Sequence, residues 1–112
     1  MAFQNITGNV LIPATAVTSA FVTLYTTPAL TRTFLKSIDV SNTTAGALTI
    51  FISLVASAGT AGTANALYSG YTIAANTTLS WRGFQVLVAG TFISVKSTTT
   101  GLTITASGGE AT

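Results

Sequence analysis

Two carboxylates, Asp39 and Glu110, and four cations are the only charged side chains of this 112-residue sequence, which contains no histidine and no cysteine. A pair of carboxylates is the minimum for acid–base hydrolysis of a glycoside. Glu110, however, follows two glycines at the end of the sequence. We expect Asp39 to face solvent or to pair with a cation such as Arg82, and Glu110 to be solvated or to contact a neighbour. The sequence therefore predicts no catalytic residues and no enzyme.

Metal and cofactor sites are not indicated either. The usual general base, thiolate nucleophile and zinc ligands require histidine or cysteine, and calcium requires several carboxylates close together. Gly59 and Gly62 have no lysine near them, which argues against a phosphate-binding loop. We expect no metal, no cofactor and no small-molecule substrate.

Four aromatic side chains, Tyr25, Tyr68, Tyr71 and Trp81, carry the remaining chemistry. Because aromatic rings are amphipathic, they could form a platform on which a sugar stacks. Packing in the core is the competing interpretation, and it is favoured for Trp81, which has apolar neighbours in the sequence. A carbohydrate-binding module is therefore the alternative from another functional class.

Charge is scarce over the whole sequence. Charged residues make up 5% and hydrophobic residues 48%, whereas about 25% of a typical soluble domain is charged. The four cations, Arg32, Lys36, Arg82 and Lys96, are spread along the chain, and nucleic-acid binding usually needs roughly six clustered phosphate contacts. We expect no nucleic-acid partner. So little charge gives weak protection against association. The surface is therefore expected to be either a neutral coat of Thr, Ser and Asn or, as the favoured interpretation, covered in part by other subunits.

The longest mostly apolar run, residues 48–58, is interrupted by Thr49, Ser53 and Ser57. A membrane helix needs about 20 apolar residues, so no membrane partner is expected. At this length the chain is one domain.

Runs rich in Val, Ile, Thr, Phe and Tyr alternate with glycine and asparagine, a pattern typical of strands and turns. The expected strands cover residues 21–26, 33–42, 48–55, 66–73, 78–81, 84–88, 91–97 and 102–107. Turns are expected at 42–46, 82–83 and 98–101, and a loop of small residues at 56–65.

Alternation predicts which side chains share a face. In 33–42 it places Phe34, Ile38 and Val40 together, and because Lys36 falls on the same face, we expect it near a strand end where its stem can extend to solvent. In 48–55 both faces are partly apolar, which suits a central strand or one covered by a partner.

The fold class that follows is all-β: a single antiparallel β-sandwich, jelly-roll or immunoglobulin-like, of about seven to eight short strands. Because of Pro13, residues 1–20 are expected to be an N-terminal arm or edge strand, and 21–112 to be the sandwich domain. Residues 10–20 and 107–112 are the candidate contact arms.

Five segments together carry a resemblance to a known group of proteins. They are LYTTPA at 24–29, LKSIDVSNT at 35–43, IAANTTLSW at 73–81, VAGTFI at 88–93 and GLTITASGGE at 101–110. In this pattern of turns and strands the chain, from Phe21 onward, resembles small β-sandwich virion structural proteins of tailed bacteriophages, of the capsid decoration or cement type. The resemblance carries over no functional residue.

What the resemblance implies is a non-enzymatic protein that decorates or cements a capsid by burying surface. The implied partners are the major capsid protein and copies of the chain itself, and the implied location is the virion, assembled in the bacterial host cytoplasm. A tail, neck or fibre component of the virion is the alternative within this class.

Overall fold

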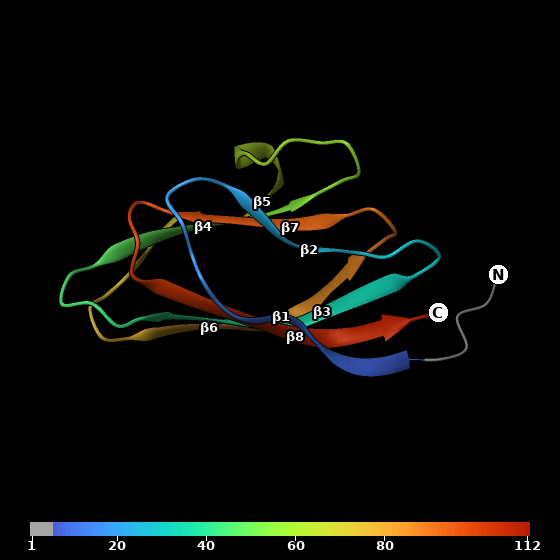
Figure 1. Cartoon of the computed structure of the whole chain (residues 1–112), viewed down its shortest axis with the longest axis horizontal. Helices are drawn as coiled ribbons and strands as arrows, with labels where there is room; N and C mark the ends of the chain where they lie inside the picture. The colour runs from blue at the N-terminus through green and yellow to red at the C-terminus, as the bar shows by residue number, and fades with distance from the viewer. Residues whose placement is uncertain (1–5) are drawn as a thin grey trace.

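The computed structural model describes residues 6–112, which form two layers of β-strands facing each other (Figure 1). The strands are β1 (Ile6–Ala16), β2 (Val22–Thr26), β3 (Arg32–Asn42), β4 (Leu48–Val55), β5 (Ala66–Ile73), β6 (Thr78–Leu87), β7 (Phe92–Ser97) and β8 (Leu102–Ala111). Within this range the one helical segment is a 3₁₀ turn, η1 (Thr63–Asn65). The described residues therefore include no helix long and apolar enough to cross a membrane.

The strand order defines the topology. One sheet has the order β1-β8-β3-β6 and the other β2-β7-β4-β5. Every pairing is antiparallel, and β1 pairs with β8, β2 with β7, β3 with β6 and β4 with β5. Wrapping one long hairpin of four strand pairs into two sheets produces this order, which is the eight-stranded jelly roll. The predicted all-β antiparallel sandwich is confirmed, and of the two predicted topologies the jelly roll is observed.

The core lies between the sheets and is built from alternate residues of each strand, as the pleat of a strand requires. Both central strands of each sheet contribute, β8 and β3 on one side and β7 and β4 on the other. The largest fully buried side chains of this core are Ile12, Leu35, Ile38, Val40, Ile50, Ile52, Leu87, Ile93, Val95, Leu102 and Ile104.

A β-bulge in β3 changes the predicted faces. The pairing of β3 with both neighbours shifts between Leu35 and Ser37. Lys36 is an extra residue relative to β8, and the alternation of β3 reverses there. Relative to β6 the extra residue lies in β6, because Gly83 and Phe84 both fall opposite Lys36. Leu35 is consequently buried with Ile38, while Phe34 lies on the outer face. The predictions that Phe34 shares the core face and that Lys36 lies near a strand end were therefore wrong.

The predicted turn at 82–83 was also wrong, because β6 is continuous from Thr78 to Leu87. Arg82 pairs in register with Ser37. Gly83 lies against the indole of Trp81, where an added Cβ would be 2.7 Å from Cζ2. This glycine marks a close approach of a side chain to the strand and not a reversal of the chain.

The two candidate contact arms lie within the sandwich. Residues 107–111 continue β8 between β1 and β3, so the C-terminal segment forms a central strand and is not a free arm. Of the N-terminal segment 1–20, residues 6–16 form the edge strand β1, and Leu11 and Ile12 are buried. Residues 1–5 of that segment lie outside the described residues.

The turn predicted at 42–46 is observed, and Asn42 holds it. Its amide Nδ2 donates to the carbonyls of Gly46 and Ile73, and its Oδ1 accepts from the backbone N–H and the hydroxyl of Thr44. A buried asparagine bonded in this way stabilises the loop between β3 and β4 by mimicking a backbone turn.

Candidate protein-interaction surfaces

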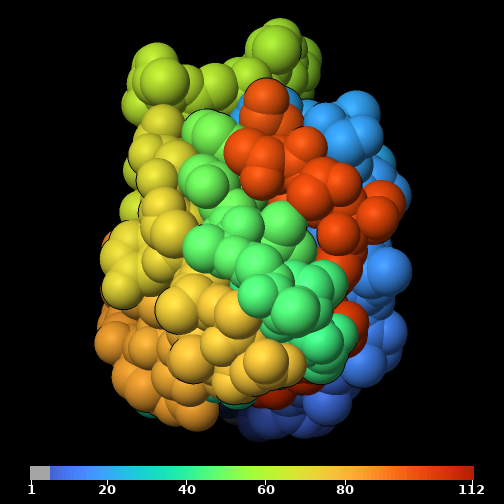
Figure 2. Space-filling view, turned by 90° about the vertical axis from the view of Figure 1, so that its left-hand side faces the viewer, coloured from blue at the N-terminus to red at the C-terminus, as the bar shows by residue number. Residues whose placement is uncertain are grey.

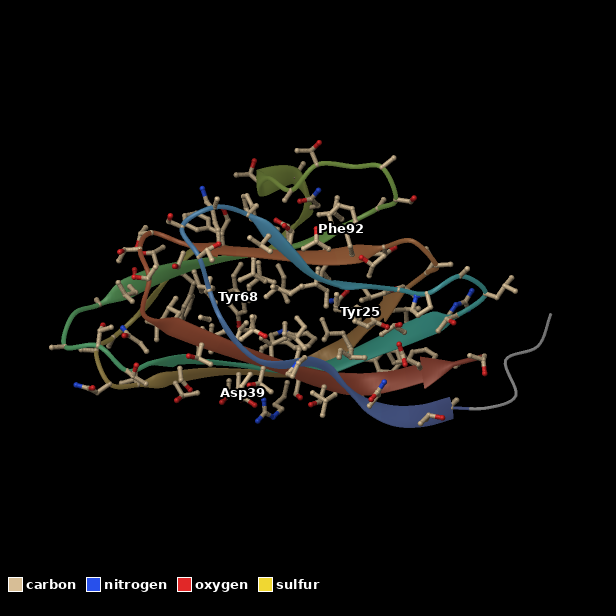
Figure 3. All side chains as sticks on the ribbon, in the orientation of Figure 1. Tyr25, Asp39, Tyr68 and Phe92 are labelled. Atoms are coloured by element: carbon tan, nitrogen blue, oxygen red, sulfur yellow. The ribbon has the colours of Figure 1, made fainter. Side chains whose placement is uncertain are left out.

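Glu110 points into the space between the sheets. The hydroxyl of Tyr25, on β2 of the opposite sheet, donates to Glu110 Oε2 at 2.5 Å, and Asn9 Nδ2 on β1 donates to Oε1 at 2.9 Å. Tyr25 has only one proton to donate, so its oxygen accepts from the hydroxyl of Thr33, 2.7 Å away on β3. Figure 3 shows Tyr25 directed inward between the two layers. Glu110 is thus part of a link between the sheets, contrary to the prediction that it is solvated or contacts a neighbour.

This environment changes the acidity of the phenol. Burial, and then the hydrogen bond to Glu110, raise the pKa of Tyr25 from its ordinary value of 10.0 to about 12. Both causes favour the neutral phenol, because an ionised phenolate would be poorly solvated and would face the carboxylate.

Asp39 lies on β3, in the same sheet as Glu110 but toward the other end of the strands, and it is on the outer face of that sheet (Figure 3). It accepts hydrogen bonds from Ser80 at 2.8 Å and from Arg82 at 3.0 Å, which confirms the predicted pairing with Arg82. These two bonds, Ser80 first, lower the pKa of Asp39. The two carboxylates lie on opposite faces of one sheet, so the fold does not bring Asp39 and Glu110 together.

The predicted aromatic platform is only partly exposed. Tyr68 and Trp81 pack against the core cluster, which agrees with the core interpretation of Trp81. Tyr71 is 48% exposed, and its ring meets that of Tyr68 edge-on, with centroids 5.2 Å apart. Tyr25 is engaged with Glu110. Tyr71 on the edge strand β5 is therefore the one half-exposed ring of the four. A single ring of this kind is a poor match to a flat platform for sugar stacking.

An apolar surface occupies the outer face of β1-β8-β3-β6, at the end where β1 begins and β8 ends. Phe34 stacks on Phe84 with centroids 5.4 Å apart, and Lys36 Nζ lies 5.5 Å from the centroid of Phe84. Together with Ile6 and Gly109 these residues line a hollow of about 240 Å³, and we name this group of five residues the Phe34 patch. Phe84 is 58% and Ile6 69% exposed, because no second layer of the described chain covers this face of the sheet.

The other sheet, β2-β7-β4-β5, is covered at one end by the loop 56–65, which stands above it (Figures 1 and 2). Ser53 and Val55 of β4 are buried beneath this loop. The Ser53 hydroxyl donates to the carbonyl of Gly62 and fixes the loop to the sheet. Gly59 approaches Val55 so closely that an added Cβ would be 2.9 Å from Val55 Cγ1.

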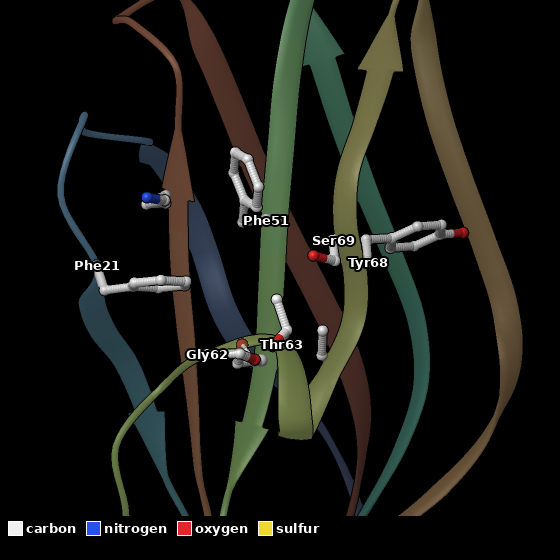
Figure 4. A pocket seen from close by; sticks show the side chains of 9 residues that line it. Phe21, Phe51, Gly62, Thr63, Tyr68 and Ser69 are labelled. Carbon is white, nitrogen blue, oxygen red and sulfur yellow. Dashed lines mark hydrogen bonds between the residues drawn. The ribbon is translucent and has the colours of Figure 1, made fainter.

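Beside the loop lies a second hollow, of about 130 Å³ (Figure 4). Lys96 of β7 lies between two rings, with its Nζ 5.1 Å from the centroid of Phe21 and 4.8 Å from that of Phe51. Thr63 and Ser69 complete the rim on the side of η1 and β5. We name this site the Lys96 hollow.

Neither the Phe34 patch nor the Lys96 hollow was predicted from the sequence. A signal for the Lys96 hollow was present, because residues 48–55 are partly apolar on both faces, and Phe51 is one of the apolar residues that line the hollow. Its neighbour across the sheet, Lys96, follows only from the pairing of β4 with β7. The Phe34 patch depends on the bulge at Lys36, which is not marked by a glycine or a proline within β3 itself.

No family model matches the chain, and no curated protein matches it in sequence. Among solved structures, it is similar to a chain in the structure of infectious bursal disease virus, Gx strain, with a TM-score of 0.54 and 11% identity. The match covers 96% of this chain and 32% of the viral chain, so the protein spans about a third of that neighbour's length. At this identity the similarity establishes a shared fold.

Proposed function

We propose that the chain is a non-enzymatic structural protein of a bacteriophage virion, a capsid decoration or cement protein that stabilises the head shell by burying surface against the major capsid protein. The observation that carries the proposal is the Phe34 patch. An antiparallel sandwich normally presents polar side chains on its outer faces, and contiguous exposed apolar groups mark interaction sites.

The energetics suit such a role. A standard interface buries about 800 Å² on each partner, and each apolar Å² contributes roughly 25 cal/mol. Loss of freedom on association offsets much of this gain. A small surplus, repeated over the many copies that coat a shell, is enough to resist its disassembly.

Two further observations support the proposal. Jelly rolls recur in viral capsid domains, although also in lectins, and fold alone does not choose between such functions. The solved chain with a similar fold comes from a virus structure. The tailed-phage assignment comes from the resemblance of segments such as 35–43 and 101–110.

A tail, neck or fibre component would use the same kind of surface. It differs in copy number, which is far lower than for a protein that coats the head. The carbohydrate-binding alternative has less support, because Tyr68 and Trp81 pack against the core.

The test is binding to heads. Purified heads that lack this protein, from the virus that carries the sequence, are mixed with the wild-type chain and with Phe84→Ser, and bound protein is measured by co-sedimentation. Phe84 is 58% exposed, so the variant should keep its fold while losing roughly tenfold or more in affinity, the effect of truncating an interface anchor.

Leu30→Ser is the matched control, because Leu30 is an exposed apolar residue outside the Phe34 patch. Its affinity should stay within about twofold of wild type. Reconstruction of the complex should place the chain on the head. Density on the tail alone, or wild-type protein that never binds heads, would contradict the assignment.

A further inference from the structure

The two lysines lie on opposite outer faces of the sandwich, and each rests on phenylalanine. Lys36 lies over Phe84 on one face, and Lys96 lies between two rings on the other. Within residues 6–112 these ring contacts are the interactions that Lys96 makes. Its ammonium group is a donor of up to three hydrogen bonds, so it is held in position with its donors available.

The Lys96 hollow has the size of a side-chain group. Its volume of about 130 Å³ is well below the roughly 300 Å³ at which small-molecule sites commonly start. The rings of Phe21 and Phe51 exclude water from two sides of the ammonium. A carboxylate entering between them would meet a fixed cation, with hydroxyls of Thr63 and Ser69 on the rim.

A second copy of the chain is poorly equipped to supply that carboxylate from its side chains. Asp39 is already bonded to Ser80 and Arg82 on its own sheet. Glu110 is bonded to Tyr25 and Asn9. The chain has no other aspartate or glutamate.

We propose that the Lys96 hollow binds an aspartate or glutamate side chain of the capsid protein. The identity of this partner rests on the proposed function. Since the Phe34 patch occupies the outer face of the other sheet, one molecule would contact protein on both faces and bridge two shell surfaces. Charge complementarity at the Lys96 hollow would fix the orientation of the bridge, because paired charges set register and exclude wrong partners.

The hollow itself is tested with a model ligand. NMR follows the Lys96 Hε/Cε signals and the Ser69 amide during titration with acetyl-Gly-Glu-Gly amide and, separately, with the isosteric neutral acetyl-Gly-Gln-Gly amide. The glutamate peptide should shift these signals several-fold more than the glutamine peptide, and Lys96→Met should abolish the difference. Equal shifts from the two peptides, or shifts that persist in Lys96→Met, would overturn the proposal.

The partner is tested on heads. Lys96→Met keeps an unbranched side chain between the rings and lowers the net charge by one. Ala45→Glu, in an exposed turn, lowers the charge equally at a distant position and is the matched control. Lys96→Met should weaken head binding roughly tenfold, and Ala45→Glu by less than about twofold.

The outcomes separate the two proposals. Wild-type binding that Lys96→Met leaves unchanged overturns this inference and leaves the proposed function standing. Absence of wild-type binding overturns the proposed function and the identity of the partner, and the peptide titration then decides whether the hollow accepts a carboxylate at all.

Discussion

Tyr25 joins the two sheets at the level of single residues. Its hydroxyl reaches across the space between the layers and bonds to Thr33 and Glu110, which are paired in the opposite sheet. The protein has only two carboxylates, and one of them is used in this link. A carboxylate placed between sheets needs hydrogen-bond donors, because leaving it unsatisfied there costs more than an ordinary hydrogen bond contributes.

We therefore expect Tyr25→Phe to lower the free energy of unfolding by about 2 kcal/mol, because the variant removes a hydrogen bond to a charged group. Urea denaturation at pH 7 measures the change. Tyr71→Phe is the control, since that side chain is 48% exposed and its ring meets the ring of Tyr68 edge-on. It should change the free energy by less than about 0.5 kcal/mol.

Stability at alkaline pH gives a second test of the Tyr25→Phe variant. The pKa of Tyr25 is raised from 10.0 to about 12 in the folded protein, so the folded state holds its proton more tightly than the unfolded state. The resulting stabilisation is complete below pH 10 and is lost as the pH rises from 10 through 12. Wild type should lose stability over this window more steeply than Tyr25→Phe. Identical pH profiles would show that Tyr25 does not make this link.

At the level of elements, the fit between β3 and β8 depends on Gly108. The bulge at Lys36 brings the backbone of β3 so close that a Cβ on Gly108 would be 1.9 Å from the carbonyl oxygen of Phe34. A backbone atom cannot move aside as the end of a flexible side chain can. This contact therefore couples the bulge, and the exposure of Phe34 that follows from it, to the glycine on the neighbouring strand.

Gly108→Ala should lower the free energy of unfolding by about 3 kcal/mol, the upper range for overpacking, as measured by thermal or urea denaturation. Gly8→Ala is the control on the same sheet, because within residues 6–112, its own chain neighbours aside, no atom lies within 4 Å of the position of its Cβ. It should be neutral to within about 0.5 kcal/mol. Similar losses in both variants would point to a general effect of alanine and not to the close approach.

The same elements explain what the sequence could and could not predict. The bounds of β4 and β5 follow from their composition, and the turn at 42–46 follows from Asn42. The prediction placed Gly83 in a turn and Gly108 in a C-terminal contact arm, however, since a glycine required by a close contact looks identical in sequence to one required by a turn or a loop. Both interaction surfaces depend on pairings between distant strands and on one bulge, which local alternation does not encode.

On the scale of the whole molecule, the structure is elongated, with extents of 49, 26 and 19 Å, and its first and last strands are neighbours. β8 lies between β1 and β3. The residues predicted as a contact arm therefore hold one sheet together, and the contacts that we propose with a partner would be made by side chains on the sheet faces.

Deleting residues 107–112 should consequently abolish cooperative folding, because it removes half of β8, leaves β1 without a partner along that length and takes from β3 one of its two partners. Circular dichroism and a melting curve measure the outcome. Deleting Thr112 alone is the control, since this residue follows β8 and is exposed, and its loss should be nearly neutral. A well-folded 1–106 fragment would contradict the central position of β8.

The pairing of Ile6 with Ala111 places the first described residue and the end of β8 directly opposite each other on neighbouring strands of one sheet. A short linker between them would turn the polypeptide into a ring, and the ring could be reopened within the exposed loop 56–65 with every strand pairing kept, since such surface sites commonly tolerate new ends. A peptide fused to this molecule can therefore be displayed either from the β1–β8 side or, after permutation, from the opposite face.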